Sequence, residues 1–335
     1  MIRYRLTILL AVFVSTNVLG QTSDLSQFFL ILPKAHPALA GVDDFFQINM
    51  SYSQPLNNVT STSGSYALSM FKALGNNDAL GGVQRGSRVS NPKLIQQYGR
   101  LPSIRRRHGV GFLAENTQLG PQEELDIRAY YSYHIPISKR TSLSLGTSAG
   151  IYQNQVDFSS FQVRNPSDDI FYQNLIQSEG NQIHALLDLG VSIYSQKFYL
   201  SISGRSLIDE ALGGNEFLSN FSREQSINGL IGYKIRLSSN IRLHMNGAIE
   251  YSELYNEDYF GAIRVLIHEI IYLGGAYDHD SKWSVLAGFN VSKKMYLSYA
   301  YDRHTDFLNE FSDGSHHLTL SLALSNFYFN QPYAW

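Results

Sequence analysis

Hydrophobic side chains alternate with small or polar ones along most of this chain. Between residues 142 and 152, Leu143 and Leu145 share one parity, whereas Ser144 and Ser148 share the other. A helical period would scatter these side chains around a cylinder, but a period of two places them on opposite faces of a sheet. The same alternation recurs in residues 182–194, 227–237, 241–251 and 317–325. The pattern predicts an all-β protein.

About fourteen segments show this alternation. They lie near residues 45–53, 63–73, 108–117, 124–136, 142–153, 181–194, 197–206, 225–237, 241–251, 258–267, 270–278, 282–291, 293–302 and 315–328. An even number of antiparallel strands is typical of a single-chain outer-membrane β-barrel. From the fourth segment onward, short connections such as 138–140 and 195–196 alternate with longer ones such as 154–180 and 207–224. Barrels of this class have short periplasmic turns and longer extracellular loops, so we expect both termini in the periplasm.

The composition favours a barrel over a soluble β-sandwich. Charged residues make up 16% of the chain, against roughly 25% in soluble domains. The polar face consists mainly of Ser, Gly, Asn, His and Tyr, which suits a crowded wet lumen better than a solvated outer face. In hydrocarbon every backbone group must be paired, so the sheet has to close. We interpret the aromatic C-terminus, Phe327 to Trp335, as a girdle and assembly signal at the final strand.

The N-terminus has the features of an export signal. Arg3 and Arg5 precede an apolar run from Leu6 to Val14, and Val18-Leu19-Gly20 resembles a cleavage site. We therefore expect a signal peptide at residues 1–20, a periplasmic segment or plug at 21–44 and the barrel at 45–335. The chain has no cysteine, which excludes disulfides, thiol catalysis, thiolate metal sites and lipoprotein anchoring.

The sequence offers little catalytic chemistry. His279, Asp302 and His304 are expected at one rim of the barrel, but no serine motif or spaced ligand set completes a site. His316 and His317 should point to opposite faces of the last strand, which argues against shared metal ligation. We therefore predict a protein that is not an enzyme and has no metal and no cofactor. The net charge of -2 predicts no nucleic-acid partner.

One connection breaks the turn pattern. Residues 74–107 join the second and third segments on the side where turns should be short, and they are rich in glycine and basic residues. The basic residues include Arg100 and the consecutive Arg105, Arg106 and Arg107. Two interpretations stay open: a solvated insertion, or a periplasmic docking element whose arginines bind phosphate or an acidic partner surface.

The start of the mature chain resembles the PorP/SprF family of the type IX secretion system. The resemblance rests on Ser26-Gln27-Phe28, on Pro33 and on the run His36-Pro37-Ala38-Leu39-Ala40-Gly41, which is similar to the family's N-terminal signature. Residues 109–112, 119–121, 131–137 and 145–151 also resemble family segments. His36 and Leu39 depart from the family's usual Asn and Tyr, and the 74–107 insertion is longer, so the chain resembles a divergent member.

The resemblance implies an outer-membrane component that assists secretion or surface attachment of a large, adhesin-like protein. Its implied partners are a secreted surface protein with a C-terminal sorting domain, other type IX secretion components and outer-membrane lipid. Candidate partner-binding residues are Ser26, Gln27, Phe28, Pro33, His36, Pro37, Ala38, Ala40, Gly41, Arg100, Arg105, Arg106 and Arg107.

Two alternatives accompany this hypothesis. Because its prolines cannot continue a strand ladder, segment 22–41 should form an irregular plug or rim at the periplasmic mouth, and its role could be structural closure alone. A barrel of fourteen strands could also be a channel or transporter for a small solute.

Overall fold

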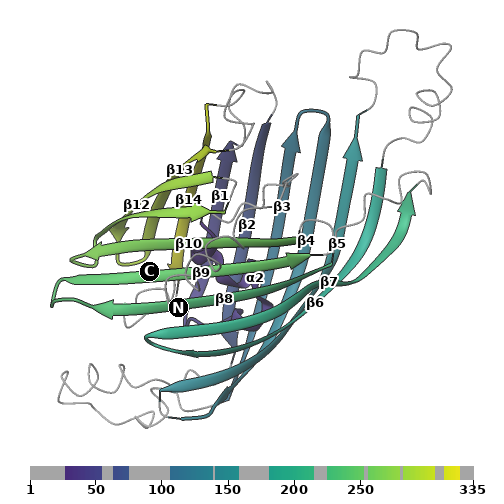
Figure 1. The fold of residues 1–335 in the computed structure, drawn as a ribbon. Coiled ribbons are helices and arrows are strands. Elements are labelled where there is room, and N and C mark those ends of the chain that lie inside the picture. Colours follow the sequence, from purple (N-terminus) through teal and green to yellow (C-terminus); the bar gives the residue numbers. More distant parts are fainter. Residues whose placement is uncertain are drawn as a thin grey trace, which may run out of the picture.

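A computed structural model shows one closed antiparallel β-barrel (Figure 1). It describes residues 27–54, 63–74, 106–138, 140–157, 181–214, 225–252, 256–279, 282–305 and 313–324. The strands within these ranges are β1 (Phe46–Gln54), β2 (Ser63–Leu74), β3 (Arg107–Leu119), β4 (Gln122–Pro136), β5 (Thr141–Val156), β6 (Asn181–Ser195), β7 (Phe198–Gly214), β8 (Ser226–Arg236), β9 (Ile241–Ser252), β10 (Asn256–Ile267), β11 (Ile271–Asp278), β12 (Lys282–Ser292), β13 (Met295–His304) and β14 (Ser315–Leu324). The predicted barrel of about fourteen strands is confirmed.

The barrel closes between its first and last strands. Each strand pairs with its neighbours in the sequence, and β1 also pairs with β14 from Phe46 opposite Leu324 to Gln54 opposite His316. This pairing leaves the sheet without an open edge at the seam, which is the condition for a sheet to lie in hydrocarbon. The single closed layer excludes the two-layered sandwich.

The two faces of the wall separate as the alternation predicts. In β5, Ser144 and Ser148 are 0% and 1% exposed, whereas Leu145 and Ile151 are 46% and 50% exposed. The buried polar side chains face the lumen, and the exposed apolar ones face outward. A wall that is apolar outside and polar inside is the arrangement of a membrane barrel. Within the described residues, no helix is long and apolar enough to cross a membrane.

A buried ionic network braces one side of the lumen. The Arg128 guanidinium donates to Asp126 at 2.7 Å and also to Asp188. Asp188 accepts further hydrogen bonds from the Ser148 hydroxyl at 2.6 Å and from the Ser206 backbone N–H at 2.8 Å. These partners satisfy charges that have almost no solvent contact, which is what makes a buried ion pair tolerable.

Most of the tight turns lie at one end of the barrel, called here the short-turn end, whereas the two-residue turn Gly120-Pro121 between β3 and β4 lies at the opposite end. Residues 137–140, 196–197, 237–240, 268–270 and 293–294 lie there, and so do the start of β1 and the end of β14. The opposite end, called the long-loop end, joins β5 to β6 and β7 to β8. This alternation agrees with the sequence prediction.

The prediction for β7 was wrong at one end. Residues 207–224 were expected to form a loop, but β7 continues to Gly214. Ser206 has a φ of 50°, and the register with β6 shifts between Leu187 and Leu189. This bulge changes the parity of the strand. Leu207 and Ile208, which are adjacent in the sequence, are therefore both exposed and do not alternate. The alternation rule therefore predicted that the strand ends at Ser206, eight residues too early.

Candidate functional site

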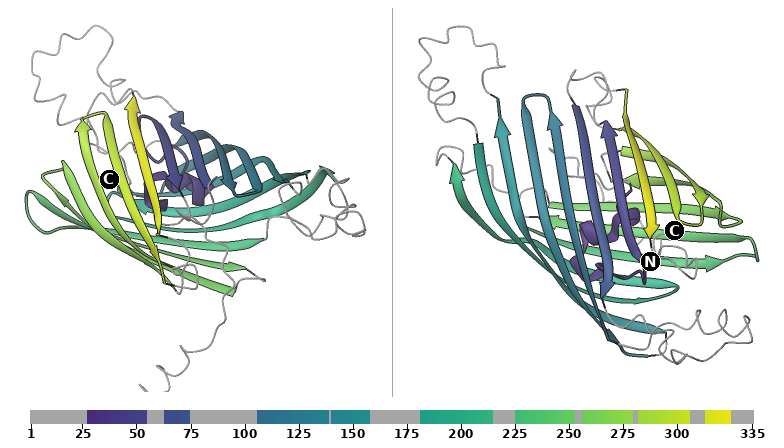
Figure 2. Two further views of the ribbon diagram at one scale, coloured as in Figure 1. Left: turned by 90° about the horizontal axis from the view of Figure 1, so that it is seen from above. Right: turned by 180° about the vertical axis from the view of Figure 1, so that it is seen from behind.

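The segment before β1 lies inside the barrel (Figures 1 and 2). This N-terminal plug, residues 27–45, contains three short turns of helix: η1 (Phe28–Ile31), α2 (Leu32–Ala35) and η2 (Pro37–Leu39). Pro33 and Pro37 each lie in the first turn of their element. Proline fixes φ near the helical value and has no N–H to satisfy there, so the sequence favours two separate turns over one continuous helix.

The first turn of the plug packs through its aromatic side chains. Phe29 is fully buried, and the Arg264 guanidinium lies 3.6 Å from the centre of its ring. Phe28 meets the ring of Phe260 edge-on at 5.3 Å. Both wall residues belong to β10, so η1 is held against that side of the lumen by apolar burial and a cation–π contact.

The last turn of the plug is held by hydrogen bonds from the opposite wall. The Ser144 hydroxyl of β5 donates to the Ala38 carbonyl at 2.5 Å, and the Ser132 hydroxyl of β4 donates to the Ala40 carbonyl at 2.6 Å. His134 Nε2 donates to the same Ala40 carbonyl at 2.8 Å. These donors satisfy carbonyls that η2 leaves unpaired in a buried place.

Glycines in the wall make room for η2. A Cβ at Gly146 would lie 2.4 Å from the Ala38 Cα, and a Cβ at Gly109 would lie 2.1 Å from the Ala40 oxygen. Both distances are far below van der Waals contact, so any side chain at these positions would displace the plug backbone. The close approach explains why two polar-face positions of β3 and β5 are glycine.

The plug leaves the lumen at the short-turn end through a tight turn. Gly41 has a φ of 66°, which a residue with a Cβ rarely adopts. Beyond it, Arg107 at the start of β3 donates to the Asp44 carboxylate, to the Val42 carbonyl at 2.6 Å and to the Tyr194 hydroxyl at 3.1 Å. This arginine ties the exit of the plug to two strands of the wall.

His36 is the polar residue at the centre of the plug. It is fully buried, and neither ring nitrogen has a hydrogen-bond partner among the residues that the structure describes. Burial, together with the positive charge of Arg205, lowers the pKa of His36 from 6.5 to about 3. The docked ring is therefore neutral at physiological pH.

The structure separates the predicted partner-binding residues into buried and exposed ones. Ser26, Arg100 and Arg105 lie outside the described residues. Gln27 is half-buried and accepts a hydrogen bond from Thr319 at 2.7 Å. Buried within the plug are Phe28, Pro33, His36, Pro37, Ala38, Ala40 and Gly41. Arg106 is exposed, whereas Arg107 turns inward to the plug exit.

Sequence reasoning missed the wall residues that receive the plug. Ser144 and Gly146 were read as members of a small polar face, and Gly109, Ser132 and Gly146 as parts of segments that resemble the family, but none was expected to contact the plug. Their signal in the sequence is the clustering of Ser and Gly at alternate positions of neighbouring strands. That clustering indicates close backbone approach, but it does not identify which segment approaches.

The polar residues at the long-loop end divide between the two faces. Asp302 lies in the lumen, 3.2 Å from both Lys282 Nζ and His317 Nε2. His316 points outward and pairs with the Tyr299 hydroxyl at 2.8 Å. The expected separation of His316 and His317 is confirmed.

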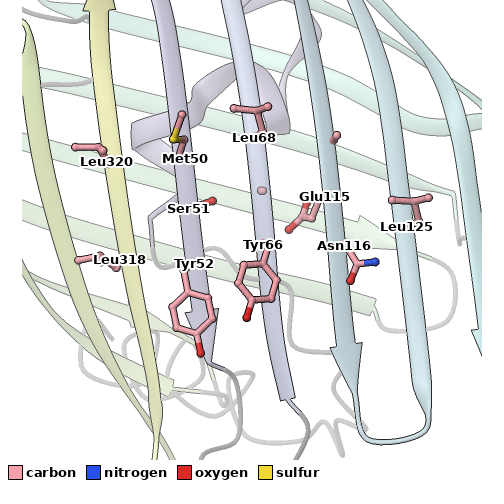
Figure 3. A pocket seen from close by; sticks show the side chains of 12 residues that line it. Met50, Ser51, Tyr52, Tyr66, Leu68, Glu115, Asn116, Leu125, Leu318 and Leu320 are labelled. Carbon is pink, nitrogen blue, oxygen red and sulfur yellow. The ribbon is translucent and has the colours of Figure 1, made fainter.

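A groove of about 530 Å³ lies on the outer wall across β14 and β1 to β4 (Figure 3). Met50, Leu68, Leu318 and Leu320 are among its lining residues, and the rings of Tyr52 and Tyr66 lie beside one another 5.1 Å apart. The small Ala114 on β3 leaves the hollow between larger neighbours. Because this face is the apolar one, the groove is a feature of the membrane-facing surface and not part of the lumen.

Several solved barrels are similar in fold. The outer membrane protein Omp33 of Acinetobacter baumannii is 8% identical with a TM-score of 0.48, covering 84% of this chain and 99% of that one. The CymD monoaromatic hydrocarbon channel is 11% identical with a TM-score of 0.48, covering 90% and 94%. The toluene transporter TodX of P. putida is 9% identical with a TM-score of 0.44, covering 86% and 92%. Likeness at this level carries no argument about function.

The comparison of the sequence with protein families is more specific than the comparison of folds. No curated protein matches it. The model of the family described as type IX secretion system membrane protein PorP/SprF matches residues 17–322, nearly the whole chain. The plug, strands β1 to β13 and most of β14 fall within that match. This closed barrel is an outer-membrane protein, and the chain belongs to the PorP/SprF family of type IX secretion.

Proposed function

We propose that this protein serves type IX secretion by binding a large, adhesin-like secreted protein with a C-terminal sorting domain and assisting its secretion or surface attachment. Its short-turn end lies in the periplasm and its long-loop end at the cell surface. The barrel acts as a docking component and not as an enzyme. Family membership supports this role, and one structural feature favours docking over conduction.

That feature is the plug, which crosses the lumen. On one side η2 is bonded to β4 and β5, and on the other side Phe28 and Phe29 pack against β10. Lys34 pairs with Glu115 of β3 at 2.8 Å. A segment held on facing walls obstructs the path that a polypeptide or solute would take. Partners therefore meet the protein at its two ends.

The periplasmic end offers the more specific contact. Arg106 is exposed there, at the end of the basic insertion and directly before Arg107, which ties down the plug exit. Arginine suits recognition of carboxylate-rich protein surfaces because its fork of donors matches a carboxylate. We place contacts with other secretion components at this insertion. The buried signature residues serve closure of the lumen.

A channel for a small solute is the second candidate. Mixed lumen charges such as Arg128 and Asp188 are compatible with it. The plug opposes it, because its buried contacts would have to break before solute could pass. The two functions differ in what a cell without the protein would lose.

The test is deletion of the gene with quantitative proteomics of the cell surface and medium. Loss of one large protein with a sorting domain from the surface, and its retention in the cell or release unanchored, is the expected result. Complementation with a chain whose Arg106 is changed to Gln should restore surface delivery only partly. Unchanged secreted proteins together with reduced uptake of a small solute would replace docking with transport.

A further inference from the structure

The short-turn end of the barrel carries a ring of exposed cations. This basic rim is defined as Lys72 and Arg236, near the ends of β2 and β8, together with Arg106 just before β3 and Arg140, Lys197 and Lys294 in the connections β4–β5, β6–β7 and β12–β13. Among the described residues of this end, the exposed acidic ones are Asp44 and Glu269, and each pairs with an arginine, Arg107 and Arg242 respectively. The rim therefore keeps a net positive charge.

The opposite end has the reverse sign. Its exposed charged side chains in the described ranges are Glu123, Asp157, Glu210, Glu257 and Asp313. Arg303 and Lys282 are the cations nearest that rim, and they are half-buried and buried. A net charge of -2 for the whole chain conceals this separation. The exposed charges of the described residues are therefore positive at one mouth and negative at the other, and so is the field that they create.

The rim cations lie beside the apolar band of the outer wall. Arg236 precedes Leu237, which is 60% exposed, and Arg140 shares a four-residue turn with Ile137, which is 59% exposed. Each residue of an extended strand lengthens the chain by about 3.3 Å. The charges of Arg236 and Arg140 therefore lie within about 10 Å of the exposed apolar side chains of Leu237 and Ile137. Turns of two to four residues cannot carry their charges deep into the periplasm.

Position and distribution together identify the partner. A soluble protein docks on one side, which would favour cations gathered on one side or on projecting loops. The basic rim instead encircles the wall at the level where hydrocarbon ends, and long Lys and Arg side chains reach from there to the phosphate layer. We propose that the basic rim binds the anionic headgroups of phospholipids in the inner leaflet around the barrel. This inference rests on the proposed orientation, with the short-turn end in the periplasm.

The test uses the purified full-length barrel in detergent, with phosphatidylglycerol and phosphatidylcholine titrated separately and bound lipids counted by native mass spectrometry. Each rim cation near the surface is worth about 1 kcal/mol, or about fivefold in affinity. A variant with Lys72→Gln, Arg140→Gln, Lys197→Gln and Lys294→Gln should lose at least about tenfold in phosphatidylglycerol affinity. Its phosphatidylcholine binding should change little.

Two controls separate charge from damage. The charge-preserving variant with Lys72→Arg, Arg140→Lys, Lys197→Arg and Lys294→Arg should bind phosphatidylglycerol like the native chain. If the fourfold Gln variant does not fold, Arg140→Gln is compared with Arg303→Gln, which removes a cation at the other end and should have no effect.

The competing outcomes are distinct. Inorganic phosphate at the same concentration should not displace the lipid, because the proposed ligand of the rim cations is the headgroup of a lipid bound at the wall and not a free anion. Equal phosphatidylglycerol affinity for the native and Gln chains would overturn the proposal. So would displacement of the lipid by free phosphate. Rim-dependent capture of an acidic protein without any lipid preference would replace it with protein docking.

Discussion

Substituting Gly146 by valine should eject the plug from the lumen. The new Cβ would lie 2.4 Å from the Ala38 Cα and backbone nitrogen, which cannot move independently of η2. Forcing atoms into a packed site costs about 1–3 kcal/mol. Relieving the overlap pulls the Ala38 and Ala40 carbonyls from their serine donors, each worth about 0.5–1.5 kcal/mol. Docking should weaken by about 2–6 kcal/mol in total.

The absence of native cysteine makes a direct assay available. Ala40→Cys places one thiol at a fully buried plug position. In outer-membrane vesicles a maleimide should label this thiol slowly in the parent and at least about tenfold faster with Gly146→Val, given about 1.4 kcal/mol per tenfold change. Single-channel conductance in planar bilayers should rise in parallel.

Gly261→Val is the matched control. It makes the same change within a strand, but a Cβ there would meet nothing within 4 Å. It should label like the parent. Equal labelling of the Gly146 and Gly261 variants, with no change in conductance, would refute the claim that close approach at Gly146 holds the plug.

Three further outcomes follow from the buried groups. Below pH 6.5 a released His36 gains a proton that the docked ring, with its pKa lowered to about 3, does not; docking should weaken by about 2 kcal/mol at pH 5. Relative to the labelling of an exposed cysteine at the same pH, which corrects for the thiolate fraction, this acid-induced gain in labelling should be lost in His36→Asn. Asp188→Asn leaves Arg128 with less compensation and should lower unfolding free energy in urea by about 3 kcal/mol. Leu145→Arg, on the outward face, should destabilise the barrel in lipid by about 2–4 kcal/mol, and Leu145→Ile should not.

The wall was predictable because lipid and lumen impose opposite demands on successive residues. Leu145 and Ser144 differ in exposure as their parity requires, and this rule extends over every strand that keeps its register. It failed at Ser206, where a positive φ inserts an extra residue and no pattern of period two remains.

The plug was less accessible to sequence reasoning. Pro33 and Pro37 show that the segment is not a strand, but its position depends on which wall positions lack a side chain. Gly109 and Gly146 are far from the plug in the sequence and acquire their meaning only when the sheet closes. Arg107 illustrates the same limit, because three consecutive arginines look alike in the sequence, and nothing in it indicates that the third turns toward Asp44.

A stopper made by the same polypeptide as the ring has a consequence for the permeability of the cell envelope. Six residues, Ala40 to Phe45, separate η2, the last turn of the plug, from the first strand. Such a short tether keeps the stopper at a high effective concentration, so dilution cannot remove it and its stoichiometry is fixed at one per pore. Each copy in the membrane then has its own stopper, and no separate lid protein has to be made in matching amounts.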